Sequence, residues 1–225
     1  MKKSKPLYII SGCIFAFFVI FTIMVSKIGV KPLGVNGTDI GFADINVDFH
    51  NKTGLHLDMY DLTDKLSIII YALMAMFAVI WVVKLFMKKF DKTIFMLGIL
   101  YILLFLFYFL FEHLIINYRP VLIEGVMEAS YPSSTTMLAT TVLITAVIAF
   151  FYLLKSKFAK AILTIIFVAF AAYMVFVRMT CGVHWLTDII GGLIASAGFI
   201  FLYGGFCASV NKPKRRYNRY RRQYE

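Results

Sequence analysis

The stretch at residues 129–154, ASYPSSTTMLATTVLITAVIAFFYLL, decides the fold, because it runs for 26 residues without a charged side chain. A helix needs about 20 mostly apolar residues to cross the hydrocarbon core of a bilayer. The apolar residues are continuous and lack the alternation of a barrel strand, which favours a membrane-spanning helix. Similar uncharged runs occur at Leu7–Val25, Leu66–Val83, Thr93–Phe111, Ala161–Val177 and Ile189–Val210.

These six runs predict an all-α polytopic membrane protein, built as a six-transmembrane-helix bundle in one domain over residues 1–225. The chain is 61% hydrophobic, which is more than a soluble domain of 225 residues carries. The first run is long for a signal peptide and lacks a clear small-residue cleavage site, so we expect it to remain as a helix. For the long connection at residues 26–64 we expect short interfacial helices, with a flexible loop as the alternative.

The distribution of charge predicts the orientation in the membrane. Lysines or arginines cluster at residues 2–5, 84–92, 155–160 and 212–222, and acidic residues cluster in the intervening connections at residues 39–64 and 124–128. The positive-inside rule then places both termini and the basic tail at residues 212–225 in the cytoplasm. The net charge of +11 is mostly juxtamembrane, which favours a topological anchor beside anionic membrane lipids over nucleic-acid binding.

Arginine is rare before the tail: Arg119 and Arg178 are the only two in the first 214 residues. Each follows or ends a long apolar run, on the side that the charge pattern marks as external. A guanidinium presents a planar fork of donors that can meet two phosphate oxygens at once. Two such groups at one membrane face predict a phosphate-binding site.

A second polar cluster opens the fourth run at Tyr131-Pro132-Ser133-Ser134-Thr135. Proline favours the first turn of a helix, where its missing N–H is not needed. Ser133 and Ser134 then supply hydroxyls and free backbone N–H groups at a helix N-terminus, which binds anions. The alternative is ordinary N-capping of a membrane helix.

A third cluster joins Arg178, His184 and Asp188. His184 and Asp188 are four residues apart, so at the start of the sixth helix they would share one face. A carboxylate bonded to one ring nitrogen fixes the tautomer and makes the other nitrogen a better nucleophile. The alternative is a structural His–Asp pair within the helix.

Together the three clusters resemble the type 2 phosphatidic acid phosphatase family, whose motifs are K-x6-R-P, P-S-G-H and S-R-x5-H-x3-D. Arg119-Pro120, Pro132-Ser133 and Arg178-x5-His184-x3-Asp188 match in order and spacing, within residues 112–188. The resemblance implies that Arg119, Arg178, Ser133 and the backbone N–H of Ser134 bind the phosphoryl oxygens. It further implies that His184 attacks phosphorus to form a phosphohistidine, that Asp188 orients it, and that no metal or other cofactor takes part.

The chain departs from the family motifs at four positions: Glu112 replaces the lysine, Ser134 the glycine, Thr135 the histidine and Val177 the serine. In the family, the histidine at the position of Thr135 protonates the leaving group, a contribution commonly worth ~10²–10⁴-fold in rate. A threonine cannot do so near neutral pH. A leaving group that is itself a phosphate needs this proton least. We therefore expect an isoprenoid diphosphate substrate such as undecaprenyl diphosphate, hydrolysed at the outer face of the cell membrane.

Three alternatives stay open on the sequence. The substrate could be phosphatidic acid or phosphatidylglycerophosphate. Glu112 or His113 could take over the acid role as an auxiliary group. The chain could also be a catalytically impaired protein that binds or transports a lipid phosphate, although His184 and Asp188 at the family spacing favour turnover. An ion channel is disfavoured because no charge interrupts the middle of a run. The sequence does not determine the oligomeric state.

Overall fold

The computed structural model describes residues 4–211, so the predicted basic tail at residues 212–225 lies outside the described residues. Within them, six helices are long and apolar enough to cross a membrane, which confirms the predicted all-α membrane fold. They are α1 (Lys5–Lys27), α3 (Leu57–Phe86), α4 (Lys92–His113), α5 (Ser134–Leu153), α6 (Lys157–Thr180) and α7 (Leu186–Val210).

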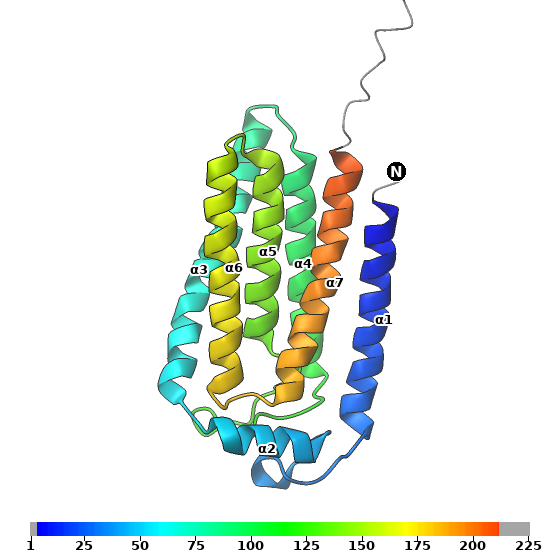
Figure 1. The fold of residues 1–225 in the computed structure, drawn as a ribbon, viewed down its shortest axis with the longest axis vertical. Coiled ribbons are helices and arrows are strands. Elements are labelled where there is room, and N and C mark those ends of the chain that lie inside the picture. Colours follow the sequence, from blue (N-terminus) through cyan, green and yellow to red (C-terminus); the bar gives the residue numbers. More distant parts are fainter. Residues whose placement is uncertain (1–3, 212–225) are drawn as a thin grey trace, which may run out of the picture.

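The core of the bundle is built around α5 and α7, whose most apolar windows are 61% and 50% buried, against 11–33% for the other four helices. Helix α7 packs against α1, α4 and α5 (Figure 1). Small residues allow close packing between membrane helices, where lipid provides no hydrophobic driving force. A Cβ on Gly198 of α7, for example, would lie 2.9 Å from the ring of Phe15 on α1.

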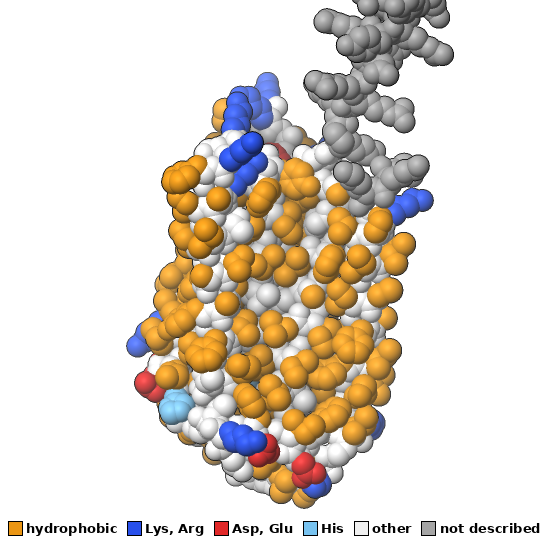
Figure 2. Space-filling view, viewed as in Figure 1, with side chains coloured by type: hydrophobic (Ala, Val, Ile, Leu, Met, Phe, Trp, Pro, Cys, Tyr) orange, Lys and Arg blue, Asp and Glu red, His pale blue; other side chains and the backbone are white. Residues whose placement is uncertain are grey.

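Charged side chains lie mainly at the two ends of the bundle, while apolar side chains cover the flank seen in Figure 2. Lysines mark the end at which α3 connects to α4 and α5 connects to α6. The opposite end carries acidic and basic side chains over α2. The molecule therefore has a broad apolar girdle that matches a bilayer, with polar ends that match water.

Helix α2 (Ala43–Thr53) lies across the end of the bundle that is opposite the α3–α4 and α5–α6 connections (Figure 1). It follows a 3-10 turn, η1 (Val35–Gly37), so the first connection contains the short helices that we expected. The side chain of Asn46 fixes α2 to α7, because its Nδ2 donates to Thr187 Oγ1 at 2.9 Å and its Oδ1 accepts from the Thr187 N–H at 3.2 Å.

Two helix starts differ most from the boundaries of the apolar runs. Helix α3 begins at Leu57, nine residues before its run, because a helix can continue into the polar boundary region where acidic residues stay solvated. Helix α5 begins at Ser134, five residues after its run starts. Pro132 therefore lies two residues before the helix and not in its first turn, and the Tyr131–Pro132 peptide bond is cis.

Candidate active site

A short antiparallel pairing between α4 and α5 positions the first site residues. Tyr118 pairs with Ala129, the Arg119 N–H donates to the Glu128 carbonyl at 3.1 Å, and the Ser130 N–H donates to the Asn117 carbonyl at 2.9 Å. From the other side, Trp185 Nε1 donates to the Tyr118 carbonyl at 2.8 Å. The pairing thus holds Arg119 and Ser130 beside the start of α7.

The two arginines meet over one aromatic ring, that of Tyr60 on α3. The guanidinium carbon of Arg178 lies 4.5 Å from the ring centroid, and that of Arg119 lies 5.5 Å from it. Cations are attracted to the face of an aromatic ring, most strongly when water is excluded. The Tyr60 ring therefore contacts both guanidinium groups.

Each arginine also has an acidic partner, yet each keeps unused donors. Arg178 Nη2 donates to Asp64 Oδ1 at 3.3 Å, and Arg119 Nε lies 3.0 Å from Glu128 Oε2. Among the described residues, Nε and Nη1 of Arg178 and Nη1 of Arg119 are buried without a hydrogen-bond partner. Buried donors are normally satisfied, so these unpaired N–H groups are suited to an anionic ligand.

Sequence reasoning missed Tyr60 and Asp64, because both precede the apolar run of α3. The signal that could have found them is the spacing of Tyr60, Asp64, Ser67 and Tyr71, which repeats at helical intervals. All four line a cavity of about 270 Å³ together with both arginines, Ser134 and Thr135.

A second cavity, of about 210 Å³, is lined by Arg119, Ser134, His184, Glu112 and Glu128 among others. The two cavities share Arg119, Ser134 and Tyr108, so they adjoin each other at the N-terminus of α5. The first turn of a helix presents free N–H groups and a positive dipole end. The structure thus brings Arg119, Arg178, Ser134, Thr135, Glu112 and His184 to one polar region.

Ser133 and His113 line neither cavity. The Ser133 side chain is fully buried and its Oγ donates to Thr136 Oγ1 at 3.0 Å, while its N–H donates to the Asp188 carbonyl at 3.0 Å. The Ser133 side chain therefore makes no capping hydrogen bond to the N-terminus of α5. The exposed His113 ring stacks on Phe109, with Nδ1 at 2.9 Å from the Phe109 carbonyl oxygen.

His184 lies two residues before α7, not within it as the four-residue spacing led us to expect. Its side chain is buried, and its Nε2 has no hydrogen-bond partner among the described residues. Burial, reinforced by the charges of Arg119 and Arg178, lowers the pKa of His184 well below its ordinary value. The imidazole is therefore neutral near pH 7, which leaves a ring nitrogen with a free lone pair.

The contact between His184 and Asp188 also differs from the expected direct hydrogen bond. Nδ1 of His184 is 3.8 Å from Asp188 Oδ2, which is too long, whereas it is 3.1 Å from Ser130 Oγ. Ser130 Oγ in turn donates to Asp188 Oδ2. The buried carboxylate also accepts from the Trp185 N–H at 2.9 Å and from Asn117 Nδ2 at 3.4 Å.

Comparisons with known proteins bear on the family and the fold. Residues 112–208 match the family model of the PAP2 superfamily. The fold is similar to the crystal structure of a transmembrane PAP2 type phosphatidylglycerolphosphate phosphatase from Bacillus subtilis, with a TM-score of 0.65 and 18% sequence identity over 91% of this chain and 98% of that chain. The search of curated proteins finds no match. Residues 112–208 are thus similar to the PAP2 superfamily, in a chain whose fold is similar to that of a transmembrane PAP2 protein.

Proposed function

We propose that this protein is a membrane lipid phosphatase that works through a phosphohistidine at His184. The observation that carries the proposal is the unpartnered, buried Nε2 of His184, in a cavity that also contains Arg119 and Ser134. The unused donors of Arg178 line the adjoining cavity. A nucleophile beside fixed positive charge and a helix N-terminus is what phosphoryl transfer requires.

The proposed reaction has two steps. The Nε2 lone pair attacks phosphorus, the bond from phosphorus to the leaving-group oxygen breaks, and the leaving group departs with its electron pair. Arg119, Arg178 and the N–H groups at the start of α5 stabilise the charge that develops on the phosphoryl oxygens. Water then attacks phosphorus and the P–N bond breaks, which releases inorganic phosphate, while the proton of the water passes to solvent.

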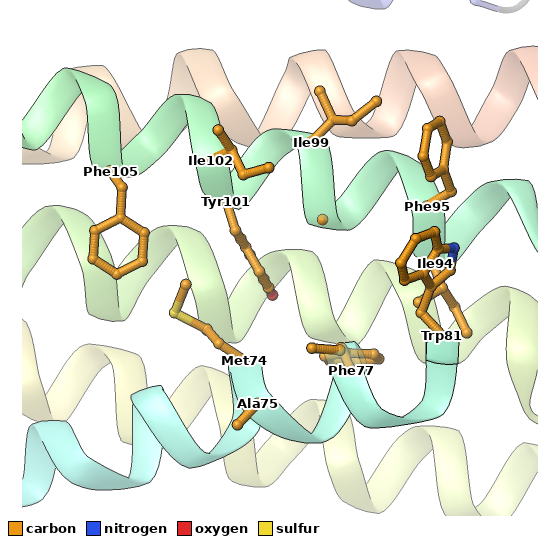
Figure 3. Close-up of a pocket in the computed structure, with 12 residues that line it drawn as sticks. Met74, Ala75, Phe77, Trp81, Ile94, Phe95, Ile99, Tyr101, Ile102 and Phe105 are labelled. Carbon is orange, nitrogen blue, oxygen red and sulfur yellow. The ribbon is translucent and has the colours of Figure 1, made fainter. Parts of the chain in front are cut away.

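An apolar groove supports a lipid as the substrate. The groove lies between α3 and α4, has a volume of about 440 Å³ and is lined by apolar side chains such as Met74, Phe77 and Ile102 (Figure 3). Phe105 lines both this groove and the cavity that holds Arg178. A hydrocarbon chain attached to a bound phosphate can therefore continue from the polar site into the groove.

The leaving group is proposed to be a phosphate, so that an isoprenoid diphosphate such as undecaprenyl diphosphate is converted to the monophosphate. Thr135 lines the Arg178 cavity at the position where the family has a histidine acid. A lipid phosphate can leave without full protonation, whereas the alkoxide from phosphatidic acid cannot. The site is proposed to face the outside, because the starts of α5 and α7 lie at the end of the bundle opposite the lysine-rich α3–α4 and α5–α6 connections (Figure 1).

Phosphate release by the purified protein tests the proposal. The assay compares undecaprenyl diphosphate with phosphatidic acid and phosphatidylglycerophosphate at equal surface concentration. We expect the highest kcat/KM on the diphosphate, and we expect His184→Ala to abolish release while the exposed control His113→Ala retains it. Full activity of His184→Ala refutes the nucleophile. A preference for phosphatidic acid refutes the leaving-group proposal.

Glu112 provides a second candidate for the acid, because it lines the same cavity as His184. If it protonates an alkoxide, Glu112→Gln lowers the rate on phosphatidic acid by far more than the rate on the diphosphate. Equal rates for the variant and the wild-type protein on both lipids exclude the role. Binding of the lipids without any release of phosphate favours the alternative of a lipid-phosphate binding protein.

A further inference from the structure

We infer that Ser130 is a positioning residue that carries the interaction between His184 and Asp188 and thereby fixes the nucleophilic tautomer. The inference deepens the proposed function, since it concerns the group that orients the proposed nucleophile. Ser130 lies outside the three sequence motifs, and its hydroxyl is the atom that stands between the two residues.

The distances define the bridge. Ser130 Oγ is 3.1 Å from His184 Nδ1 and donates to Asp188 Oδ2, while the direct separation of Nδ1 and Oδ2 is 3.8 Å. All three side chains are at most 3% exposed. The bridge is therefore buried, and the serine hydroxyl is the contact through which the carboxylate acts on the ring.

A count of protons assigns the tautomer. An ionised carboxylate only accepts hydrogen bonds, and a serine hydroxyl has one hydrogen. When Asp188 is ionised, that hydrogen goes to Asp188, Ser130 Oγ accepts from the ring, and Nδ1 of His184 carries the proton. Nε2 is then the nitrogen with the lone pair, and it is the one without a partner.

The surrounding backbone keeps Ser130 in this position. Its N–H donates to the Asn117 carbonyl at 2.9 Å, and the side chain of Asn117 donates to the other carboxylate oxygen of Asp188 at 3.4 Å. The next residue, Tyr131, is anchored to α1 by a 2.9 Å hydrogen bond between its hydroxyl and Thr22 Oγ1. The bridge is thus part of a network that joins three segments of the fold.

The bridge changes the chemistry without transferring a proton. When Nε2 bonds to phosphorus and the leaving group departs, the ring becomes a cation that still carries its Nδ1 proton. The partial negative charge on Ser130 Oγ, polarised by Asp188, stabilises that cation. Loss of a hydrogen bond to a charged group corresponds to a rate loss of about 10–100-fold. The loss is expected in kcat, because the phosphate-binding donors are unchanged.

Kinetics of Ser130→Ala, Ser130→Thr and the control Ser196→Ala test the role. Ser196 is also a buried serine, but it donates to the backbone carbonyls of Met137 and Gly192 and lines neither cavity. We expect Ser130→Ala to lower kcat by about 10–100-fold at constant KM, Ser130→Thr to recover part of it, and Ser196→Ala to keep the wild-type kcat. Wild-type kcat in Ser130→Ala overturns the inference.

A second measurement does not depend on turnover. The protein has four histidines, so ¹⁵N-histidine NMR of the full chain in detergent can resolve His184, assigned by its loss in His184→Gln. We expect the Nδ1–H tautomer in the wild-type protein and a loss of this preference in Ser130→Ala. An Nε2–H tautomer in the wild-type protein overturns the inference even if Ser130→Ala fails to fold. Retained activity in His184→Ala would instead refute the proposed function.

Discussion

At the scale of single residues, Arg178 is buried whereas its acidic partner Asp64 is exposed. Arg178 has a side chain that is 1% exposed, yet that of its acidic partner Asp64 is 67% exposed. A carboxylate so open to water holds a guanidinium weakly, since exposed ion pairs contribute only about 0–1 kcal/mol. The exposed Asp64 carboxylate therefore leaves the Arg178 guanidinium readily available to a phosphate.

We predict that Asp64→Asn lowers KM for the lipid substrate, because the phosphate no longer competes with a carboxylate for Arg178. The upper limit of about 1 kcal/mol for an exposed pair corresponds to about a fivefold decrease. Steady-state kinetics in mixed micelles measures it. Asp61→Asn is the control, as Asp61 is exposed on the same helix but lines neither cavity, and a rise in KM for Asp64→Asn would contradict the prediction.

The depressed pKa of His184 gives the second prediction at this scale. The nucleophile must be neutral, and burial with the charges of Arg119 and Arg178 keeps it neutral below its ordinary pKa of 6.5. We expect kcat/KM to stay level as pH falls through 6.5 and to decline only at lower pH. Arg119→Gln removes one of the causes, so its normalised profile should decline at higher pH than that of the wild-type protein. If the normalised pH profiles of Arg119→Gln and the wild-type protein overlap, the charge of Arg119 does not contribute to the lowered pKa of His184.

At the scale of elements, the contact between α7 and the start of α5 depends on glycine. A Cβ on Gly192 of α7 would lie 2.9 Å from the Ser133 carbonyl oxygen, and one on Gly191 would lie 2.5 Å from the Tyr131 ring. Both contacts are too close to accept without movement. The segment that carries Ser130 and leads into the phosphate-binding helix terminus is therefore seated directly on α7.

We predict that Gly192→Ala displaces this segment and lowers both stability and activity. Overpacking a close contact typically costs about 1–3 kcal/mol. Gly12→Ala is the matched control, because a Cβ there meets nothing within 4 Å and Gly12 lies outside the groove. Thermal unfolding in detergent and kcat on the lipid substrate report the two effects. Equal midpoints and rates for the two variants would show that α5 and α7 can separate without consequence.

The elements also show what the sequence could predict. Hydropathy finds the six helices because each must bury about 20 residues in lipid. The motif spacing finds Arg119, Arg178, His184 and Asp188. It misses Tyr60 and Ser130, because these residues reach the site through the early start of α3 and the pairing before α5. Neither a charged helix end nor a two-residue pairing produces a hydropathy or motif signal.

At the scale of the whole molecule, the polar cavities adjoin the apolar α3–α4 groove, because Phe105 lines both the groove and the Arg178 cavity. The polar cavities lie at one end of the bundle, and the α3–α4 groove runs from Phe105 to Ile94 along α4. The eleven helical rises between these residues correspond to about 17 Å of groove length. A substrate with a long hydrocarbon chain can use this length, whereas a short soluble phosphate cannot.

We therefore predict that Gly98→Leu lowers kcat/KM for a long-chain isoprenoid diphosphate by about tenfold and leaves kcat/KM for a short-chain diphosphate unchanged. A tenfold loss corresponds to roughly 1.4 kcal/mol of binding free energy. Gly98 lines the groove, and a side chain there fills open space without meeting the protein. Gly12→Leu is the control, since Gly12 on α1 is also exposed, has no atom within 4 Å of its Cβ position and lies outside the groove. Equal losses on both substrates would mean that the variant disturbs the bundle. No loss on either would mean that the lipid chain lies elsewhere, because a blocked groove must exclude the chain that occupies it.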